Sequence, residues 1–310
     1  MTRYKRLMVG LDLTLTDQVI IRFICSFMKI NPGIESIYFV HVEQNLENAD
    51  SIKHMGLRDS GKPFDEILLQ EMHDEVKASA LVRGKVEMHF EILEGDPLHQ
   101  LLHWAQVKKI DLIVSGKKKR ADGKGIVMEK FAQHSQCSIL FIPQHHSLRF
   151  DKIVVPIDFS KTSEHVLERI CAFSRYLPRT RFIGLNVVEV PGGYTKIGKT
   201  FEEFSQSMIK NAKRRWEVFQ YNLPFKCSRI EPYFEICRNH NVAKTIFEYA
   251  EENNADMIII GSHEMTDTAH FLLGSVAEKV IGYDYSIVLL VVKQHVEEEV
   301  VDFFKAVKKI

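Results

Sequence analysis

The sequence has no excess of either charge, because it carries 41 lysine and arginine residues against 41 aspartate and glutamate residues. This balance gives no electrostatic reason to expect a nucleic-acid partner or an anionic membrane surface. No apolar run approaches the roughly 18 residues that a membrane-spanning helix requires. The N-terminal stretch carries Arg3, Lys5 and Arg6 and its apolar run is cut by Asp12, which is not typical of a signal peptide. We therefore expect neither nucleic acid nor a membrane as a partner.

Cysteine is scarce and scattered. The chain has five cysteines, an odd number, and no two of them stand in a CxxC pair. A disulfide framework is typical of short secreted chains, whereas scattered cysteines fit a reduced intracellular protein. Cys25 and Cys171 fall among apolar residues of expected helices, where a small buried side chain is the expected role. The pattern predicts free thiols and a cytoplasmic location.

Common catalytic and phosphate-binding motifs are missing as well. The sequence contains no Gly-x-Ser-x-Gly elbow, no Walker A sequence and no Ser-Gly-Gly-x-Asp-Ser loop. The adjacent residues His145 and His146 have no cysteine or carboxylate at metal-ligand spacing, so no metal site is predicted. No candidate base or nucleophile stands beside the glycine-bounded loop near the C-terminus. We therefore predict no catalytic residues, and efficient catalysis is not expected.

The sequence does contain an internal repeat of domain size. Asp12 follows an apolar run that aligns with the run before Asp158, at an offset of 146 residues. The apolar run that ends at Gly116 aligns with the run that ends at Gly261, at an offset of 145 residues. A repeat of this length is a domain rather than a solenoid unit. The expected organisation is a first domain, a second domain and a C-terminal helical tail, over residues 1–144, 151–293 and 294–310.

Each copy alternates short apolar runs with amphipathic stretches. This order predicts an α/β fold, with two tandem, open, five-stranded and mainly parallel sheets that carry helices on both faces. In the first copy, strands are expected at 7–11, 36–42, 85–93, 112–115 and 138–142, and helices at 17–28, 64–81, 98–106 and 127–134. In the second copy, strands are expected at 153–157, 182–188, 230–236, 257–260 and 287–292, and helices at 163–176, 201–221, 242–252 and 275–282. Ser163 and Ser275 are the expected N-caps of two of these helices.

One stretch near the C-terminus has the pattern of a phosphate-binding loop. The expected strand over 257–260 is closed by Gly261, and a loop of small and polar residues then leads to Gly274 and Ser275, where the last helix begins. A strand, a glycine-bounded loop and a helix start together aim backbone N–H groups at phosphate. The glycines allow close approach of the backbone, and Ser275 adds a hydroxyl group.

The spacing Gly-x2-Glu-x9-Gly-Ser resembles a motif of the universal stress protein family, whose nucleotide-binding members carry Gly-x2-Gly-x9-Gly-Ser/Thr. Residues 271–280 are also similar to that family. The resemblance implies an adenine nucleotide α-hydrolase-like fold and a regulatory role in stress response. It also implies binding of ATP or a related adenine nucleotide, with magnesium as a companion of the nucleotide. In Pro156-Ile157-Asp158, the resemblance implies that Asp158 hydrogen-bonds the ribose or base, and that Val187 packs on adenine.

Glu264 stands where the family motif has its second glycine. A carboxylate that faces a triphosphate costs about 1 kcal/mol per close charge pair in water, and several times more if it is partly buried. Its Cβ also occupies a place where glycine permits positive φ or a close approach. A magnesium ion that bridges Glu264 and phosphate would reverse the sign of the effect. The departure favours weak nucleotide binding in the second copy.

The first copy departs further from the motif. Gly125 corresponds to the second glycine of the loop, and the interval from Gly116 is four residues shorter than in the second copy. Ile126 replaces the hydroxyl residue, and a run of four basic residues begins at Lys117. Such a run is more often a solvated loop than an anion site. Together with Asp12, these glycines mark a degenerate site, where no ATP binding is expected.

Three interpretations stay open from the sequence. The first is a nucleotide-sensing regulatory protein whose second copy binds ATP weakly. The second is a ligand-free interaction module, in which Asp158 only caps a loop and the glycines only serve tight turns. The third, slow ATP hydrolysis, has the least support, because no catalytic group is apparent.

The resemblance also bears on assembly. In the family, the fifth strands commonly pair across a dimer and cover an open sheet edge. Here both fifth strands, 138–142 and 286–292, belong to one chain and are apolar. We therefore expect them to meet as an intramolecular pseudo-dimer, with further homodimerisation left open.

Overall fold

The computed structural model describes residues 4–46, 63–79, 86–117, 126–144, 149–262, 273–283 and 286–293. Residues up to 144 are called the first half below, and residues from 149 the second half. Three features of the sequence lie outside the described residues: Glu264, Gly125 and the tail expected over 294–310.

The described residues form the expected alternation of strands and helices. The first half contains β1 (Arg6–Leu11), α1 (Leu15–Ile30), β2 (Ser36–Glu43), α2 (Phe64–Ala78), β3 (Glu87–Glu94), α3 (Pro97–Val107), β4 (Leu112–Lys117), α4 (Ile126–His134) and β5 (Ser138–Pro143). The second half contains β6 (Lys152–Pro156), α5 (Lys161–Ser174), β7 (Arg181–Glu189), η3 (Tyr194–Ile197), α6 (Phe201–Asn222), β8 (Ile230–Cys237), α7 (Val242–Glu252), β9 (Met257–Gly261), α8 (Ser275–Gly282) and β10 (Val288–Val292). Every strand and helix expected in the two copies is present, and the short helix η3 is the one addition among the described residues.

The strands of the described residues form a single ten-stranded sheet in the order β3-β2-β1-β4-β5-β10-β9-β6-β7-β8. Strands within each half are parallel. β5 and β10 pair antiparallel, with Leu140 opposite Leu290. The prediction that the two fifth strands meet is therefore confirmed. Because this junction is antiparallel, the strands of the two halves run in opposite directions. Their C-terminal ends therefore point to opposite sides of the sheet, along the strand direction.

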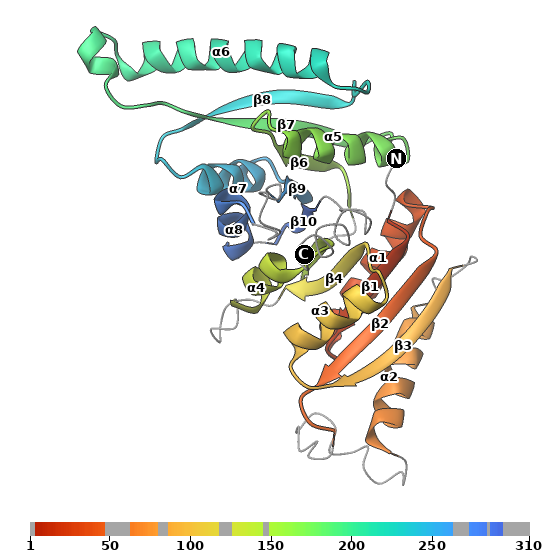
Figure 1. Ribbon diagram of the computed structural model, residues 1–310. Helices are drawn as coiled ribbons and strands as arrows, with labels where there is room; N and C mark the ends of the chain where they lie inside the picture. The colour runs from red at the N-terminus through yellow and green to blue at the C-terminus, as the bar shows by residue number, and fades with distance from the viewer. Residues whose placement is uncertain are drawn as a thin grey trace, which may run out of the picture.

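Helices cover both faces of the sheet (Figure 1). One core layer includes Phe23 of α1 and Trp216 of α6. The other includes Val280 of α8. The strand residues alternate between the two layers, as with Met8 and Val9, because successive side chains of a strand point to opposite faces. Both layers continue across the β5–β10 junction, so the two halves share their hydrophobic core.

Two expectations about helix starts are wrong. Ser163 is the third residue of α5, and Ser275 is the first residue of α8, whose N-cap is Gly274. At the start of α5, the Oγ of Ser160 accepts a hydrogen bond from the backbone N–H of Ser163 at 3.3 Å. Ser160 therefore occupies the capping position that the sequence suggested for Ser163.

The expectation of free thiols is wrong for one pair of cysteines. A disulfide joins Cys171 of α5 to Cys227, which lies before β8, with the two Cα atoms 5.9 Å apart. The two cysteines are 56 residues apart in the sequence. They meet because α6 and the turn after it return the chain to α5, a contact that no local spacing reveals. Among the described residues, Cys25, Cys137 and Cys237 are free and buried.

Two buried lysines connect the halves at the junction. Lys293 is 2% exposed, and its Nζ donates hydrogen bonds to the carbonyls of Ala132 and Ser135 at the end of α4. Lys117 is also buried and donates to the carbonyl of Tyr283, just past the end of α8, which corrects its assignment to a solvated loop. An ammonium group at a helix C-terminus meets otherwise unpaired carbonyls and the negative end of the helix dipole. Each lysine therefore satisfies a helix end that belongs to the other half.

Replacing either buried lysine by methionine keeps an unbranched side chain but leaves buried carbonyls without their donor. We expect Lys293→Met and Lys117→Met each to lower the free energy of unfolding by about 1–3 kcal/mol. Lys130→Met, at an exposed position of α4, is the control and should change it by less than about 0.5 kcal/mol. Urea unfolding of the full chain measures all three. Equal stabilities of the Lys293→Met and Lys130→Met proteins would contradict a stabilising role for the buried ammonium.

Candidate functional site

A cavity of about 160 Å³ opens where β6, β7 and β9 end. β6 pairs with β7 on one side and with β9 on the other, so the order of strands reverses here. Ligands of open α/β sheets bind at such a reversal, beyond the carboxyl ends of the strands. The structure brings together all the second-half residues that the sequence singled out within the described chain: Pro156, Asp158, Val187, Gly261, Gly274 and Ser275.

Asp158 begins the turn between β6 and α5. Its Oδ1 accepts hydrogen bonds from the backbone N–H of Ser160 at 3.0 Å and from the Oγ of Ser163 at 2.7 Å. Burial raises the pKa of Asp158, but the hydrogen bonds from Ser160 and Ser163 outweigh burial and hold this pKa below its usual range. The carboxylate is therefore ionised at neutral pH and acts only as an acceptor. A carboxylate has about four acceptor positions, so Asp158 can accept further hydrogen bonds.

A side chain that sequence reasoning missed fixes the floor of the cavity. The Nδ2 of Asn186, in β7, donates a hydrogen bond of 2.7 Å to the carbonyl of Ile157, the residue before Asp158. In the first half, the Nδ1 of His41 lies 3.0 Å from the carbonyl of Leu11, which precedes Asp12. The sequence did carry a signal for this role, because His41 and Asn186 are polar residues at corresponding positions of the second apolar strand in each copy. Thr162 and Ser163 also line the cavity, and neither was predicted as a ligand-binding residue.

Gly261 has a packing role that does not depend on any ligand. A Cβ atom at Gly261 would lie 2.2 Å from the Cγ2 of Thr162 in α5. In the first half, a Cβ atom at Gly116 would lie 3.0 Å from the Cδ1 of Ile20 in α1. In both halves a helix approaches the fourth strand so closely that glycine fits best. These two glycines therefore do not by themselves indicate phosphate.

The start of α8 is the part of the cavity best suited to an anion. Gly274 is the N-cap and Ser275 the first residue, and within the described residues no side-chain hydrogen bond caps this helix end. The first N–H groups of a helix and its positive dipole end attract negative charge. Asp158 is the one charged residue among the described residues that line the cavity. A phosphate group here would depend on backbone N–H groups and hydroxyls.

The corresponding cavity of the first half, of about 200 Å³, has a different chemistry although Asp12 and Gly116 line it. Asp17 occupies the place that Ser163 has in the second half. It is 1% exposed and accepts hydrogen bonds from the backbone N–H groups of Asp12 at 3.1 Å and Leu13 at 2.7 Å. Burial, and after it the charge of Asp12, raises the pKa of Asp17 to about 7. Two neighbouring carboxyl groups disfavour an anion in this cavity.

The described residues offer neither a metal site nor a membrane-spanning helix. No group of three or more histidine, cysteine, aspartate and glutamate side chains among them could hold a metal ion. None of their helices combines the length and the apolar character needed to cross a membrane.

Comparisons with known proteins identify relatives of one kind. The model of the universal stress protein family matches residues 149–283. A universal stress protein of Methanocaldococcus jannaschii is 29% identical over 164 residues, which are 48% of this chain and 99% of that protein. A second one from the same organism is 28% identical over 154 residues, 46% of this chain and 83% of that protein. The crystal structure of a universal stress protein from Archaeoglobus fulgidus has a TM-score of 0.60 at 19% identity, over 94% of this chain and 97% of that one, and supports the fold alone.

The raised pKa of Asp17 makes the stability of the chain depend on pH. The carboxyl group ionises near its ordinary value of 3.8 in the unfolded chain and near 7 in the folded chain. The folded state therefore binds more protons between these values, and the free energy of unfolding falls as the pH rises from about 4 to about 7. We expect Asp17→Asn, which cannot ionise, to be more stable than the parent at pH 8 by about 1–3 kcal/mol.

Urea unfolding at pH 4 and pH 8 measures this effect. The advantage of Asp17→Asn should be small at pH 4, where the folded carboxyl group is protonated and the unfolded one is only about half ionised. Asp151→Asn, at an exposed aspartate before β6, is the control and should show no such difference between the two pH values. An Asp17→Asn protein with the same pH dependence as the parent would contradict the assignment.

Proposed function

The chain belongs to the universal stress protein family, and from this we propose that its second half binds an adenine nucleotide at the C-terminal ends of β6, β7 and β9. One observation carries the proposal: a single cavity gathers the carboxylate of Asp158, the apolar side chain of Val187 and the start of α8. These groups match the three parts of a nucleotide, namely ribose, base and phosphate.

The proposed contacts follow from the chemistry of the lining residues. Adenine packs against Val187, opposite the apolar side chains of Val242 and Ile246 of α7, which also line the cavity. Ribose hydroxyls donate hydrogen bonds to the carboxylate of Asp158. Phosphate oxygens accept from the first N–H groups of α8 and from the hydroxyl of Ser275.

The volume of the cavity limits how much of the ligand it holds. Its 160 Å³ is well below the roughly 300 Å³ of small ligand pockets. Ser275 is exposed, so the start of α8 is open to solvent. We propose that the base and part of the ribose enter the cavity. The phosphates, with any magnesium ion they carry, then lie at the solvent-exposed start of α8.

The absence of a lysine or arginine from the described lining residues supports weak binding. A regulatory role that responds to nucleotide concentration fits such a site better than catalysis does. Asp158, the one ionisable carboxylate among these residues, is held by Ser160 and Ser163, and no second group stands beside it to activate water. We therefore propose a stress-response protein that binds ATP without efficient hydrolysis.

The remaining parts of the proposal concern organisation. The two halves are proposed to be domains over residues 1–144 and 151–293, with nucleotide bound only in the second. Asp12 and Asp17 support the exclusion of phosphate from the first. A cytoplasmic location and further assembly into a homodimer are proposed from the family, and the balanced charge supports the absence of a nucleic-acid partner.

One observation favours a second candidate, a ligand-free interaction module. The close packing of Gly261 on Thr162 explains that glycine without any nucleotide. In such a module, substitutions around the cavity would change stability and would leave nucleotide affinity unchanged.

Glu264 lies outside the described residues, and its effect is predicted from its charge alone. We expect Glu264→Gly to tighten ATP binding by about 10-fold to 100-fold, or about 1.4–2.8 kcal/mol, because one charge repulsion near phosphate is removed. Asp158→Ala added to this variant should lose the gain, because the ribose is no longer held. Isothermal titration calorimetry with ATP measures each affinity.

The same titrations with and without magnesium separate the alternatives. Glu252→Gln, at the exposed end of α7, removes one negative charge elsewhere and should leave the affinity unchanged. If Glu264 binds a magnesium ion, Glu264→Gly weakens binding only when magnesium is present. Equal affinities of all variants in every condition would support the ligand-free module and contradict nucleotide binding.

A further inference from the structure

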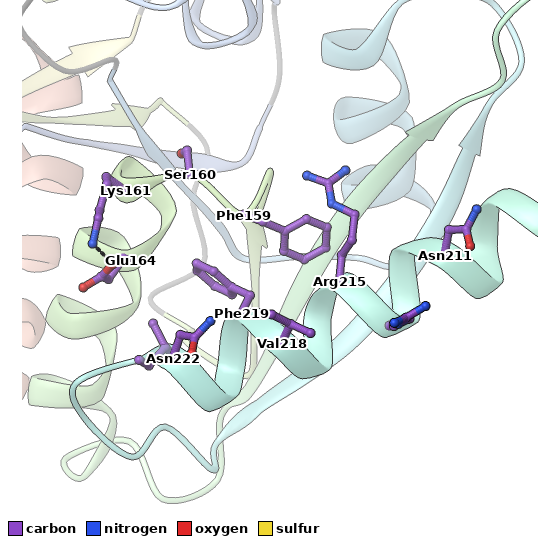
Figure 2. A pocket seen from close by; sticks show the side chains of 11 residues that line it. Phe159, Ser160, Lys161, Glu164, Asn211, Arg215, Val218, Phe219 and Asn222 are labelled. Atoms are coloured by element: carbon purple, nitrogen blue, oxygen red, sulfur yellow. Dashed lines mark hydrogen bonds and ion pairs between the residues drawn. The ribbon is translucent and has the colours of Figure 1, made fainter.

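A larger groove, of about 700 Å³, lies between the β6–α5 turn and the C-terminal half of α6 (Figure 2). Its volume falls within the roughly 300–1,000 Å³ of ligand pockets. The groove is lined from α5 and α6, whereas the described helices that line the nucleotide cavity are α5, α7 and α8. Ser160 borders both spaces, while Asp158 lines only the cavity and Phe159 only the groove. The turn therefore separates two distinct sites.

Two aromatic rings form one wall of the groove. Phe159 and Phe219 meet edge to face, with ring centroids 5.7 Å apart and planes at 60°. Val218, which is 55% exposed, extends the apolar surface along α6. Phe159 has a φ of 67°, and Leu13 at the corresponding place of the first half has a φ of 54°. The turn after the first strand of each half therefore contains a residue in the left-handed conformation. Only in the second half is that residue aromatic.

The charged residues of the groove are mainly cationic. The Nζ of Lys161 lies 3.0 Å from the Oε2 of Glu164, which is the one carboxylate among the described residues that line the groove. These two charges offset each other, which leaves the guanidinium groups of Arg214 and Arg215. The guanidinium carbon of Arg215 lies 4.8 Å from the centroid of the Phe159 ring. Figure 2 shows Arg215 and Phe159 side by side in the middle of the groove.

The two walls of the groove are connected covalently. The disulfide joins Cys171 in α5 to Cys227, which lies a few residues after the end of α6. Phe219 also packs on the buried Trp216, with ring centroids 6.2 Å apart. A site whose walls are already fixed loses less conformational entropy when it binds a ligand.

We propose that this groove binds a small aromatic anion. Its ring system packs beside Phe159 and Phe219, where aromatic pairs prefer edge-to-face or offset stacking. Its acidic group, a carboxylate, sulfonate or phosphate, is bound by Arg214 and Arg215, because guanidinium groups bind such oxygens with two parallel hydrogen bonds. The site lies outside the nucleotide cavity, and its occupation does not require the proposed function.

The test uses the full chain and 8-anilinonaphthalene-1-sulfonate, a fluorescent aromatic sulfonate. We expect saturable binding of one molecule per chain, and a loss of affinity of about tenfold or more in Arg214→Gln/Arg215→Gln. The matched control is Lys210→Gln/Lys213→Gln, which removes the same charge from exposed positions of α6 outside the groove. Its affinity should stay within about twofold of the parent, since long-range attraction between exposed charges is screened by salt.

Two further variants separate the ring contacts from the nucleotide cavity. Phe159→Leu introduces the residue found at the corresponding turn of the first half, so the fold should tolerate it, and it should weaken binding by about tenfold. Val187→Phe fills the nucleotide cavity and should leave the affinity unchanged. N-phenyl-1-naphthylamine has the same rings without the sulfonate, and it should bind the parent and the double arginine variant equally.

Several results would overturn the proposal. They are the absence of saturable sulfonate binding, an equal loss in the lysine control, or a loss in Val187→Phe. Binding that survives both the arginine substitutions and Phe159→Leu would also overturn it, because the sulfonate would then occupy another surface.

Discussion

The antiparallel pairing of β5 with β10 is the constraint on which the rest of the structure depends. All residues of both strands are buried, so either strand left as a sheet edge would expose an apolar surface and unpaired backbone groups. Their pairing creates one sheet and sets α4 against α8, where the Nε2 of Gln133 donates a hydrogen bond of 2.9 Å to the Oε1 of Glu278. It also brings Lys117 and Lys293 to the helix ends that they satisfy. Because the strands of the two halves run in opposite directions, their two cavities open at opposite ends of the strands. The residues that line one cavity can therefore differ from those that line the other.

Within that frame the two halves keep the same backbone and differ in the side chains of one turn. Both have a glycine packed under the first helix of their half and a left-handed residue after the first strand. The difference is that Asp17 in the first half corresponds to Ser163 in the second. The serine donates a hydrogen bond to Asp158 and helps to hold the pKa of that carboxyl group down, whereas burial raises the pKa of Asp17 to about 7 and places a second acidic group beside Asp12. This difference gives the two cavities different charge: among the described residues, one acidic side chain lines the second-half cavity and two line the first.

The sequence predicted the helices and strands closely, because short continuous apolar runs mark buried parallel strands and apolar residues recur at helical spacing between them. It also identified Gly261, Gly274 and Ser275, because a glycine-bounded loop has a local signature. The other predicted lining residues came from the family resemblance: Pro156, Asp158 and Val187. Asn186 was missed, because its role depends on the register between β6 and β7. Lys117 was assigned to a solvated loop, because the carbonyl that binds its ammonium group belongs to Tyr283 in the second half, far away in the sequence. The aromatic and basic groove was missed for a similar reason: Phe159 and Arg215 are far apart in sequence and meet only when α6 packs over the β6–α5 turn.

The central claim is that one of the two equivalent cavities binds nucleotide. Val187 lines the second-half cavity, and Val42 lines the first-half cavity at a similar depth of its strand. Isothermal titration calorimetry of the full chain with ATP and magnesium, on the parent and on Val187→Phe and Val42→Phe, compares the two cavities directly. We expect one ATP per chain, binding abolished by Val187→Phe, and binding unchanged by Val42→Phe. Two sites per chain, or a loss of binding in Val42→Phe with none in Val187→Phe, would contradict it.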